Sequence, residues 1–375
     1  MNQQEIINTI ALTRINYFNL VGMTELYRRC GSATTVLEHR NNIREIIPNA
    51  SQKLVEAFKN MGEAFRRAEA EYEYDMANGI LPLCMNDHRY PQRLKECDDA
   101  PLVLFYRGTA DLNQAKIISI VGTRHCTVYG QELIRQFISE LRTLCPQVLI
   151  VSGLAYGIDI CAHRHALQNG YETVGVLAHG LDYLYPHRHK PTADEMVKKG
   201  GLLTEFLTNT NADKINFVRR NRIVAGISDA CILVESAAHG GGMITMKLAR
   251  DYNRDAFAFP GAIGAPYSEG CNHLIRDQIA ALITNAHDFV KAMRWENDAL
   301  LLQAQQQGIE RQLFPELTIE EKKVVDTLSL TNDLQINMLS VKTNIPIGSL
   351  TAILFSLEMK GVVKPLPGGI YHLIQ

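Results

Sequence analysis

The sequence predicts an α/β protein: a parallel sheet with crossover helices in the middle of the chain, an all-helical module before it and a winged helix after it. Three observations lead to this prediction. Residues 1–75 carry apolar side chains at helical spacing, short β-rich runs alternate with helical stretches between residues 116 and 293, and residues 317–375 have the pattern of three helices and a hairpin. With 375 residues the chain is long enough for two or three domains.

The N-terminal segment has the spacing of amphipathic helices. Apolar residues recur three and four positions apart, as at Ile6, Ile7 and Ile10, without the alternation of a strand. The charged stretch that ends at Asn78-Gly79 predicts an exposed helix, because glycine readily adopts the left-handed conformation that closes a helix. We therefore expect a small helical module over residues 1–75.

The middle segment alternates short apolar runs with helical ones. The runs are continuously apolar, which indicates strands buried on both faces and hence a parallel sheet with crossover helices. The domain is expected to span residues 76–295. We expect its strands at residues 117–121, 148–152, 173–178, 202–206, 231–235, 256–260 and 281–284.

A polar stretch over residues 296–316 predicts a linker to a C-terminal domain over residues 317–375. That domain has the helix, helix, helix, hairpin order of a winged helix, with its hairpin turn at Pro367-Gly368-Gly369. A major-groove reader needs polar and cationic side chains on the third helix, but residues 347–360 offer one basic residue, Lys360. We expect a structural or protein-contact role for it. Its inner face is predicted to comprise Ile347, Leu350, Ile353, Leu354 and Leu357.

Composition limits the possible functions. With 38 Lys and Arg against 40 Asp and Glu the net charge is −2, so any nucleic-acid contact must come from a local patch. The eight cysteines form no CxxC pair, which fits free thiols in a reducing cytoplasm. No apolar run reaches the ~20 residues of a membrane helix, and the N-terminus lacks a secretory pattern. We expect a cytoplasmic protein without membrane contact.

Glycine-bearing loops follow five of the expected strands. Because ligands bind beyond the carboxyl ends of parallel strands, these loops are expected to lie on one rim of the sheet. Glycines there let backbone N–H groups approach a ligand, and helix amino termini add positive dipole ends, which suits phosphate oxygens. The loops are Gly122-Thr123-Arg124, Ser152–Asp159, His179-Gly180, Ser236–Thr245 and the segment with Gly261 and Gly264.

A cluster of cations lies at residues 214–222, which include Lys214 and no acidic residue. Arg219 and Arg222 are three residues apart on a helix, and with Arg124 they are predicted to line a groove for a phosphate backbone. Phe217, one turn earlier, could stack on a base or belong to the core.

Several other sites are excluded at the level of motifs. The chain has no Gly-Lys pair, which excludes a P-loop ATPase, and no GxGxxG follows the first strand of the parallel sheet. The His163/His165 and His187/His189 pairs have no thiolate or carboxylate partners to complete a metal site, so neither a metal nor a cofactor is expected. We expect no catalytic residues. Asp159 is expected to cap a helix, and Glu235 is the one acid at a strand end that could serve chemistry.

With these residues in view, the middle domain resembles the DprA family, also called Smf, of DNA-processing proteins in natural transformation. The resemblance covers roughly residues 90–290 and, more loosely, both ends. It implies an extended Rossmann-like fold that binds single-stranded DNA, helps load the RecA recombinase and forms a homodimer. The similar stretches, in the family's order, are YPQRL (90–94), DAPLVLFYRG (99–108), IVGTRHCTVYG (120–130), SGLAYGIDICAH (152–163), GLDYLYP (180–186), NFVRRNRIVAGIS (216–228), GGMITMKLA (241–249) and FPGAI (259–263).

The family's Gly-Ser-Arg phosphate loop corresponds to residues 122–124, with Thr123 in place of serine, and its Phe-Pro-x-Arg-Asn-Arg segment corresponds to residues 217–222, with Val218 in place of proline. Tyr156 occupies a position that is often arginine, and His239-Gly240 stands where Ser-Gly is typical. The N-terminal helices resemble the SAM-like or helix-hairpin-helix modules of the family. Nucleic-acid contacts are expected at Gly122, Thr123, Arg124, Ser152, Gly153, Phe217, Arg219, Arg220, Asn221, Arg222, Gly240, Gly241, Gly242 and Thr245.

Two other functions remain open from the sequence. The related LOG nucleotide phosphoribohydrolase family shares the architecture and a Pro-Gly-Gly-x-Gly-Thr motif followed by glutamate, which Gly240–Thr245 mimics only in part. A winged-helix transcription regulator is the third hypothesis. The extra helical and winged-helix domains favour DNA processing without catalysis over both.

Overall fold

A computed structural model describes residues 2–295, 317–360, 362–366 and 369–373. The chain divides into two compact units, Met1–Leu300 and Leu301–Gln375, and each is considered by itself. The linker expected at residues 296–316 lies outside the described residues.

The N-terminal segment is helical, as predicted. Asn2, Asn19, Ser32 and Ser51 each accept a hydrogen bond from a backbone N–H of the first turn, so polar caps fix the starts of four helices. The last helix ends at Ala77, near the expected boundary, and Gly79 follows at φ +63°. The elements are α1 (Gln3–Leu12), α2 (Leu20–Cys30), α3 (Ala33–Glu38), η1 (Ile43–Glu45), α4 (Gln52–Lys59) and α5 (Gly62–Ala77).

Within the described part of the chain, nine strands form one sheet in the order β1-β2-β6-β5-β4-β3-β7-β8-β9. The strands from β3 to β9 are mutually parallel where they pair, which confirms the predicted sheet. The sequence analysis missed β1 and β2, an antiparallel pair that adds to β6 at one edge. The strands are β1 (Leu81–Cys84), β2 (Val103–Gly108), β3 (Ile117–Val121), β4 (Leu149–Ser152), β5 (Thr173–Val176), β6 (Gly200–Thr204), β7 (Ala230–Leu233), β8 (Asp255–Ala258) and β9 (Ala281–Leu282).

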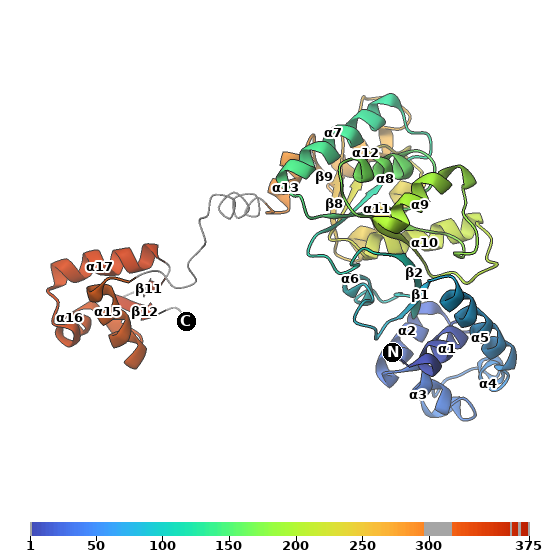
Figure 1. Cartoon of the computed structure of the whole chain (residues 1–375), viewed down its shortest axis with the longest axis horizontal. Helices are drawn as coiled ribbons and strands as arrows, with labels where there is room; N and C mark the ends of the chain where they lie inside the picture. Colours follow the sequence, from blue (N-terminus) through green and yellow to red (C-terminus); the bar gives the residue numbers. More distant parts are fainter. Residues whose placement is uncertain (1, 296–316, 361, 367–368, 374–375) are drawn as a thin grey trace. The chain divides into compact units, whose positions relative to one another are not determined.

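Helices flank the sheet on both faces (Figure 1). Alternate residues of β3 point in opposite directions, so that Ile118 and Ile120 belong to one core cluster with α7, α8 and α13, whereas Ile117 and Val121 belong to another with α10 and α11. The helices of this region are α6 (Gln92–Lys95), α7 (Val128–Leu144), α8 (Ile158–Gln168), η2 (His187–His189), α9 (Lys190–Lys198), α10 (Lys214–Gly226), α11 (Gly241–Asp251), α12 (Glu269–Arg276) and α13 (Ala286–Ala292).

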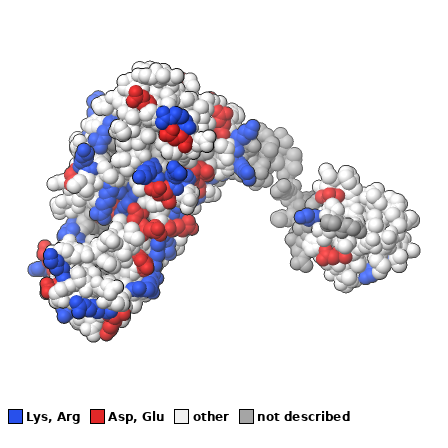
Figure 2. Space-filling model, turned by 180° about the vertical axis from the view of Figure 1, so that it is seen from behind, with Lys and Arg blue, Asp and Glu red and all other residues white. Residues whose placement is uncertain are grey.

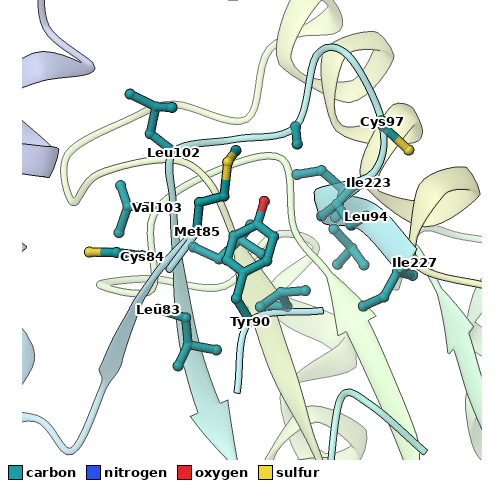
Figure 3. Close-up of a cluster of buried hydrophobic side chains, with 14 of the residues drawn as sticks. Leu83, Cys84, Met85, Tyr90, Leu94, Cys97, Leu102, Val103, Ile223 and Ile227 are labelled. Atoms are coloured by element: carbon teal, nitrogen blue, oxygen red, sulfur yellow. The ribbon is translucent and has the colours of Figure 1, made fainter. Parts of the chain in front are cut away.

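The missed strands β1 and β2 belong to a core that also includes α10. Figure 3 shows Tyr90 among buried side chains of these strands and of α6, together with Ile223 of α10 and Ile227, the residue that follows α10. The Tyr90 hydroxyl donates to the carbonyl oxygen of Pro101 at 2.7 Å, so the buried polar atom is satisfied. All eight cysteines are free thiols, as predicted.

The C-terminal unit is a winged helix, as predicted. Its strands pair in the order β10-β12-β11, and a compact apolar core includes Val324, Leu339, Leu350 and Leu354. Ile347 is 48% exposed and lies on the outer surface of α17, which corrects its predicted inward position. Pro367 and Gly368 of the expected turn lie outside the described residues. The elements are α15 (Ile319–Leu330), β10 (Leu334–Gln335), α16 (Ile336–Thr343), α17 (Ile347–Met359), β11 (Val363–Leu366) and β12 (Ile370–Leu373).

Charged side chains of both signs are interspersed on the first unit, whereas the C-terminal unit shows few of them on the face drawn in Figure 2. Among the described residues, no single helix is both long and apolar enough to cross a membrane. One bent pair, α16 and α17, meets the length and composition criteria together.

Candidate functional site

A cavity of about 990 Å³ opens at the carboxyl ends of β3, β4, β5 and β7, and we call it the rim cavity. It lies where the strand order reverses, because successive crossovers lead from β3 through β4 to β6 on one side and through β7 to β9 on the other. Parallel sheets bind ligands at such switch points. Three of the five expected glycine-bearing loops, those after β3, β4 and β7, line the rim cavity. Gly261 lines a neighbouring cavity, whereas His179, Gly180 and Gly264 line neither.

The loop after β3 forms one wall of the rim cavity. The backbone N–H of Thr123 donates to the Glu235 carbonyl at 2.7 Å, and the Thr123 carbonyl accepts from Ile158 N–H at 3.1 Å. A Cβ atom on Gly122 would come within 2.7 Å of that Glu235 carbonyl, so only glycine allows the close approach. The loop is thereby fixed between the β7 loop and α8, and it presents the exposed Arg124 to the cavity.

The opposite wall includes the amino end of α11. Gly240 is the N-cap residue of α11, and no side chain caps this helix. Gly240, Gly241 and Gly242 line the cavity, so the backbone N–H groups at the start of α11 donate no hydrogen bond to a capping side chain. Such a terminus is suited to bind an anion. Thr245 also lines the cavity, but its hydroxyl donates to the Gly241 carbonyl at 3.2 Å.

One face of α10 completes the cavity. Lys214, Phe217 and Asn221 line it at helical spacing. The Arg124 guanidinium lies over the Phe217 ring, 4.5 Å from its centroid, and the Arg220 guanidinium lies 5.8 Å from the same centroid. These are cation–π distances, so Phe217 brings two positive charges together.

Arg220 lines the cavity although it is only 3% exposed. Its guanidinium donates to the Gly153 carbonyl at 2.6 Å and to the Val176 carbonyl, and thus braces the ends of β4 and β5. A Cβ atom at Gly153 would lie 2.2 Å from Arg220 Nη1, so a larger residue there would displace this guanidinium. Burial lowers the pKa of Arg220 to about 10, which leaves it cationic at neutral pH. Burial raises the pKa of Asp159, the acid beside Arg220 in the cavity, and Arg220 opposes that rise.

Three residues predicted to contact nucleic acid do not line the rim cavity. Arg219 and Arg222 lie on another side of α10, where both pair with Glu205 at 3.0 Å and 2.5 Å. Arg222 also donates to the Asp99 carbonyl. The Ser152 hydroxyl is buried and donates to the Ile120 carbonyl at 2.6 Å, which joins β4 to β3. The prediction that Arg219 and Arg222 share a groove with Arg124 is therefore corrected, because Glu205 binds both.

Sequence reasoning omitted four lining side chains: His125, Tyr185, Lys247 and Tyr267. His125 follows β3, Tyr185 follows β5, and Lys247 lies two turns into α11. A search of every segment that follows a parallel strand could have found these residues, because ligands bind beyond the carboxyl ends of such strands. Among the residues that the structure describes, neither Arg124, Lys214 nor Lys247 pairs with a carboxylate. With Arg220 they make the cavity cationic, whereas Asp159 is its only acidic lining residue within that part of the chain.

The acids at the rim have structural partners. The Glu235 carboxylate accepts from Thr127 N–H at 2.9 Å and from the Thr127 hydroxyl at 2.5 Å, at the start of α7. Asp159 lies in the first turn of α8 and accepts from Ala155 N–H at 3.4 Å, but the N-cap residue is Gly157 and no side chain caps the helix, so the predicted capping role of Asp159 is wrong. In the described ranges, no group of three or more His, Cys, Asp or Glu side chains is arranged to hold a metal.

Two family models match this chain. The one described as DNA recombination-mediator protein A matches residues 82–294, and the one described as DprA winged helix domain matches residues 311–369. DNA processing protein DprA of Streptococcus pneumoniae is 39% identical over 202 residues, which cover 54% of this chain and 70% of that protein. Protein Smf of Escherichia coli is 33% identical over 292 residues, which cover 76% of this chain and 75% of that protein.

Two solved structures are similar as well. DNA processing protein A (DprA) from S. pneumoniae superimposes with a TM-score of 0.66 at 31% identity, over 76% of this chain and 97% of that chain. DNA processing protein A from Helicobacter pylori, described by its unique single-stranded DNA binding mode, superimposes with a TM-score of 0.52 at 27% identity, over 58% and 96%.

Proposed function

Since this chain belongs to the DprA/Smf family of DNA-processing proteins, we propose that its rim cavity binds single-stranded DNA through the phosphate backbone. The observation that carries the proposal is the composition of that cavity: Arg124, Lys214, Arg220 and Lys247 line it together with the amino end of α11. This arrangement suits phosphate oxygens, because cations and free helix N–H groups converge on one space. The H. pylori relative described as binding single-stranded DNA supports the same ligand.

The aromatic side chains favour a single strand over a duplex. Phe217 and Tyr185 both line the rim cavity, with ring centroids 6.1 Å apart and planes at 67°. Unpaired bases can stack on such rings, whereas the bases of a duplex are already stacked on each other. Stacking and phosphate contacts tolerate any base, so the protein is proposed to bind with little sequence preference.

The wider role that we propose follows the family. The protein acts in the cytoplasm as a homodimer without catalytic activity, protects incoming single strands during natural transformation, and helps load RecA onto them. No metal or cofactor takes part in this proposal. The family membership and the cationic cavity support the DNA role, while the dimer and RecA rest on the resemblance alone.

The test of DNA binding compares two arginines in one titration. Arg124→Ala removes a side chain that lines the cavity, and we expect roughly tenfold weaker binding of a labelled oligothymidylate. Each phosphate group that the variant no longer binds should also lower the log–log salt slope by about 0.7. Arg219→Ala is the matched control, because Arg219 is 49% exposed but pairs with Glu205 away from the cavity. Affinity and slope that are unchanged in Arg124→Ala would refute the proposal.

The partners need a separate measurement. Light scattering at micromolar protein should give the mass of a homodimer, and immobilised protein should retain purified RecA. In the same system, RecA should assemble faster on strands coated with single-strand-binding protein when this protein is added. A monomer that retains no RecA would contradict the proposed partners without affecting the DNA site.

A further inference from the structure

A second cavity of about 480 Å³ lies beside the rim cavity, between the start of α7 and the loop that follows β8. We call it the apolar cavity. Tyr267 lines both cavities, and its ring stacks on the His125 ring of the rim cavity with centroids 5.9 Å apart and planes at 23°. The two spaces are therefore neighbours that share one aromatic wall. The residues that line the apolar cavity are Thr127, Tyr129, Glu235, Pro260, Gly261, Ala262, Ala265, Pro266, Tyr267 and Ser268.

The loop that forms this cavity is fixed by specific hydrogen bonds. The Tyr129 hydroxyl donates to the Pro260 carbonyl at 2.8 Å, and Ser236 N–H donates to the Tyr267 carbonyl at 2.7 Å. The Asn272 side chain binds both the N–H and the carbonyl of Gly261, at 3.1 Å and 3.0 Å. The cavity is thus formed before any ligand arrives, which is typical of small-molecule sites.

The lining chemistry excludes an anion and favours a flat neutral group. None of the lining residues is Lys, Arg or His, and the single charged one, Glu235, already accepts two hydrogen bonds from Thr127. A phosphate would meet this carboxylate without a counterion. Two tyrosine rings and two prolines offer apolar surfaces of the kind on which an aromatic ring stacks.

We propose that the apolar cavity holds a nucleobase of the same strand whose phosphates lie in the rim cavity. The inference rests on the proposed function, and it adds a base subsite to the phosphate site. The shared Tyr267 argues for this occupant, because a strand that runs along the cationic rim past His125 brings its next base to that ring. The base stacks with its flat apolar face on the tyrosine ring, so the subsite accepts purines and pyrimidines alike.

The test uses the full-length protein, a labelled oligothymidylate and a backbone of the same length with abasic residues, at one fixed salt concentration. Tyr267→Ala removes the shared ring, and Ala265→Phe fills the apolar cavity without touching the rim cavity. Both variants should bind oligothymidylate about tenfold more weakly, and Ala265→Phe, which leaves the rim cavity unchanged, should bind the abasic strand as wild type does. Tyr267→Phe should bind both strands normally. Tyr17→Ala, which removes a tyrosine that is 69% exposed in the loop between α1 and α2, is the control and should also bind normally.

Unchanged oligothymidylate binding in Ala265→Phe, with the variant shown to be folded by thermal melting, would overturn the base subsite. So would an equal loss of affinity for both strands in Ala265→Phe. Arg124→Ala separates the two proposals, because it should lower the affinity for oligothymidylate and for the abasic strand by the same factor. If Arg124→Ala binds both strands normally, the proposed function fails, and the base subsite fails with it.

Discussion

At the scale of single residues, the three arginines of α10 have different roles because they bind different partners. Arg220 is buried and braces two strand ends while it lines the rim cavity. Arg219 and Arg222 both bind Glu205, and the latter is only 5% exposed. The single carboxylate of Glu205 holds both guanidinium groups away from the rim cavity, so neither arginine lines it.

Glu235 illustrates the same principle for an acid. It is 4% exposed and its carboxylate binds the N–H and hydroxyl of Thr127, the N-cap residue of α7. A Cβ atom on Gly130 would lie 2.2 Å from Glu235 Oε2, so the carboxylate also fits closely against the helix. These contacts give Glu235 a structural role at the start of α7.

We therefore predict that the purified protein releases no ribose 5-phosphate from AMP, and that Glu235→Ala lowers the free energy of unfolding by about 2 kcal/mol. Two hydrogen bonds to a charged group are lost in that variant, and both Thr127 donors lose their partner. Urea unfolding measures the stability, and Glu132→Ala, an exposed glutamate of the same helix, should leave it nearly unchanged. Enzymatic release of ribose 5-phosphate that is lost in Glu235→Gln would instead support the phosphoribohydrolase hypothesis.

At the scale of elements, α5 ties the N-terminal helices to the loop after β6. Its Glu71 accepts from the N–H of Thr208 at 2.8 Å and pairs with Arg67 at 2.7 Å, and Arg67 donates to the Thr208 carbonyl. Asp75, one turn further on, is 1% exposed. Burial and the neighbouring Glu71 raise the pKa of Asp75 from 3.8 to about 8. Folded protein thus holds a proton on α5 that unfolded protein releases.

This raised pKa predicts a pH dependence of stability. Between pH 4 and pH 8 the folded state binds more protons at Asp75 than the unfolded state does. The contribution of Asp75 to the free energy of unfolding is therefore fully present at low pH and is lost as the pH rises through 8. The loss is at most about 1.4 kcal/mol per pH unit. Asp75→Asn should remove this slope and be more stable than wild type at pH 8.

Denaturant unfolding at pH 5, 6, 7 and 8 measures the effect as the difference between variant and wild type. Asp194→Asn serves as the control because the Asp194 side chain is 59% exposed, and its stability should follow wild type at every pH. A difference between Asp75→Asn and wild type that stays constant across this range would contradict the assignment.

At the scale of the whole molecule, the two compact units differ in their surface chemistry. The rim cavity of the first unit is cationic, whereas the helix of the second that would enter a major groove, α17, presents Phe355 and Met359, which are 64% and 75% exposed. Lys360, at its end, pairs with Glu321 at 2.6 Å. This surface lacks the cations that phosphate contacts require.

Truncation after Phe314 should therefore leave the affinity for single-stranded DNA within about threefold of the full chain, a change below ~1 kcal/mol. The reason is that the cavity-lining cations all lie in the retained unit. Titration of both proteins with one labelled strand at one salt concentration measures this, with Arg124→Ala in the truncated protein as the positive control. A tenfold loss in a truncated protein that melts cooperatively would show that the winged helix contributes to DNA binding.

The sequence by itself determined the N-terminal helices, the parallel strands and the winged helix, and it predicted the rim of the sheet that the candidate site occupies. Continuous apolar runs identified β3 to β9, and helical spacing identified the N-terminal helices. The rule that ligands bind beyond the carboxyl ends of parallel strands placed three glycine-bearing loops, those after β3, β4 and β7, at one cavity. These features are local, because periodicity and turn residues depend on neighbours along the chain. The apolar character of α17 was equally visible.

Only the tertiary structure decided which charges face a ligand. Glu205 binds Arg219 and Arg222 from the loop after β6, 14 and 17 residues earlier in the chain, and Arg220 donates to acceptors at the ends of two strands. The antiparallel pair β1 and β2 and the apolar cavity around Tyr267 likewise appear only when distant segments meet. A charged side chain takes its role from the group opposite it, and at these positions that group comes from another part of the chain.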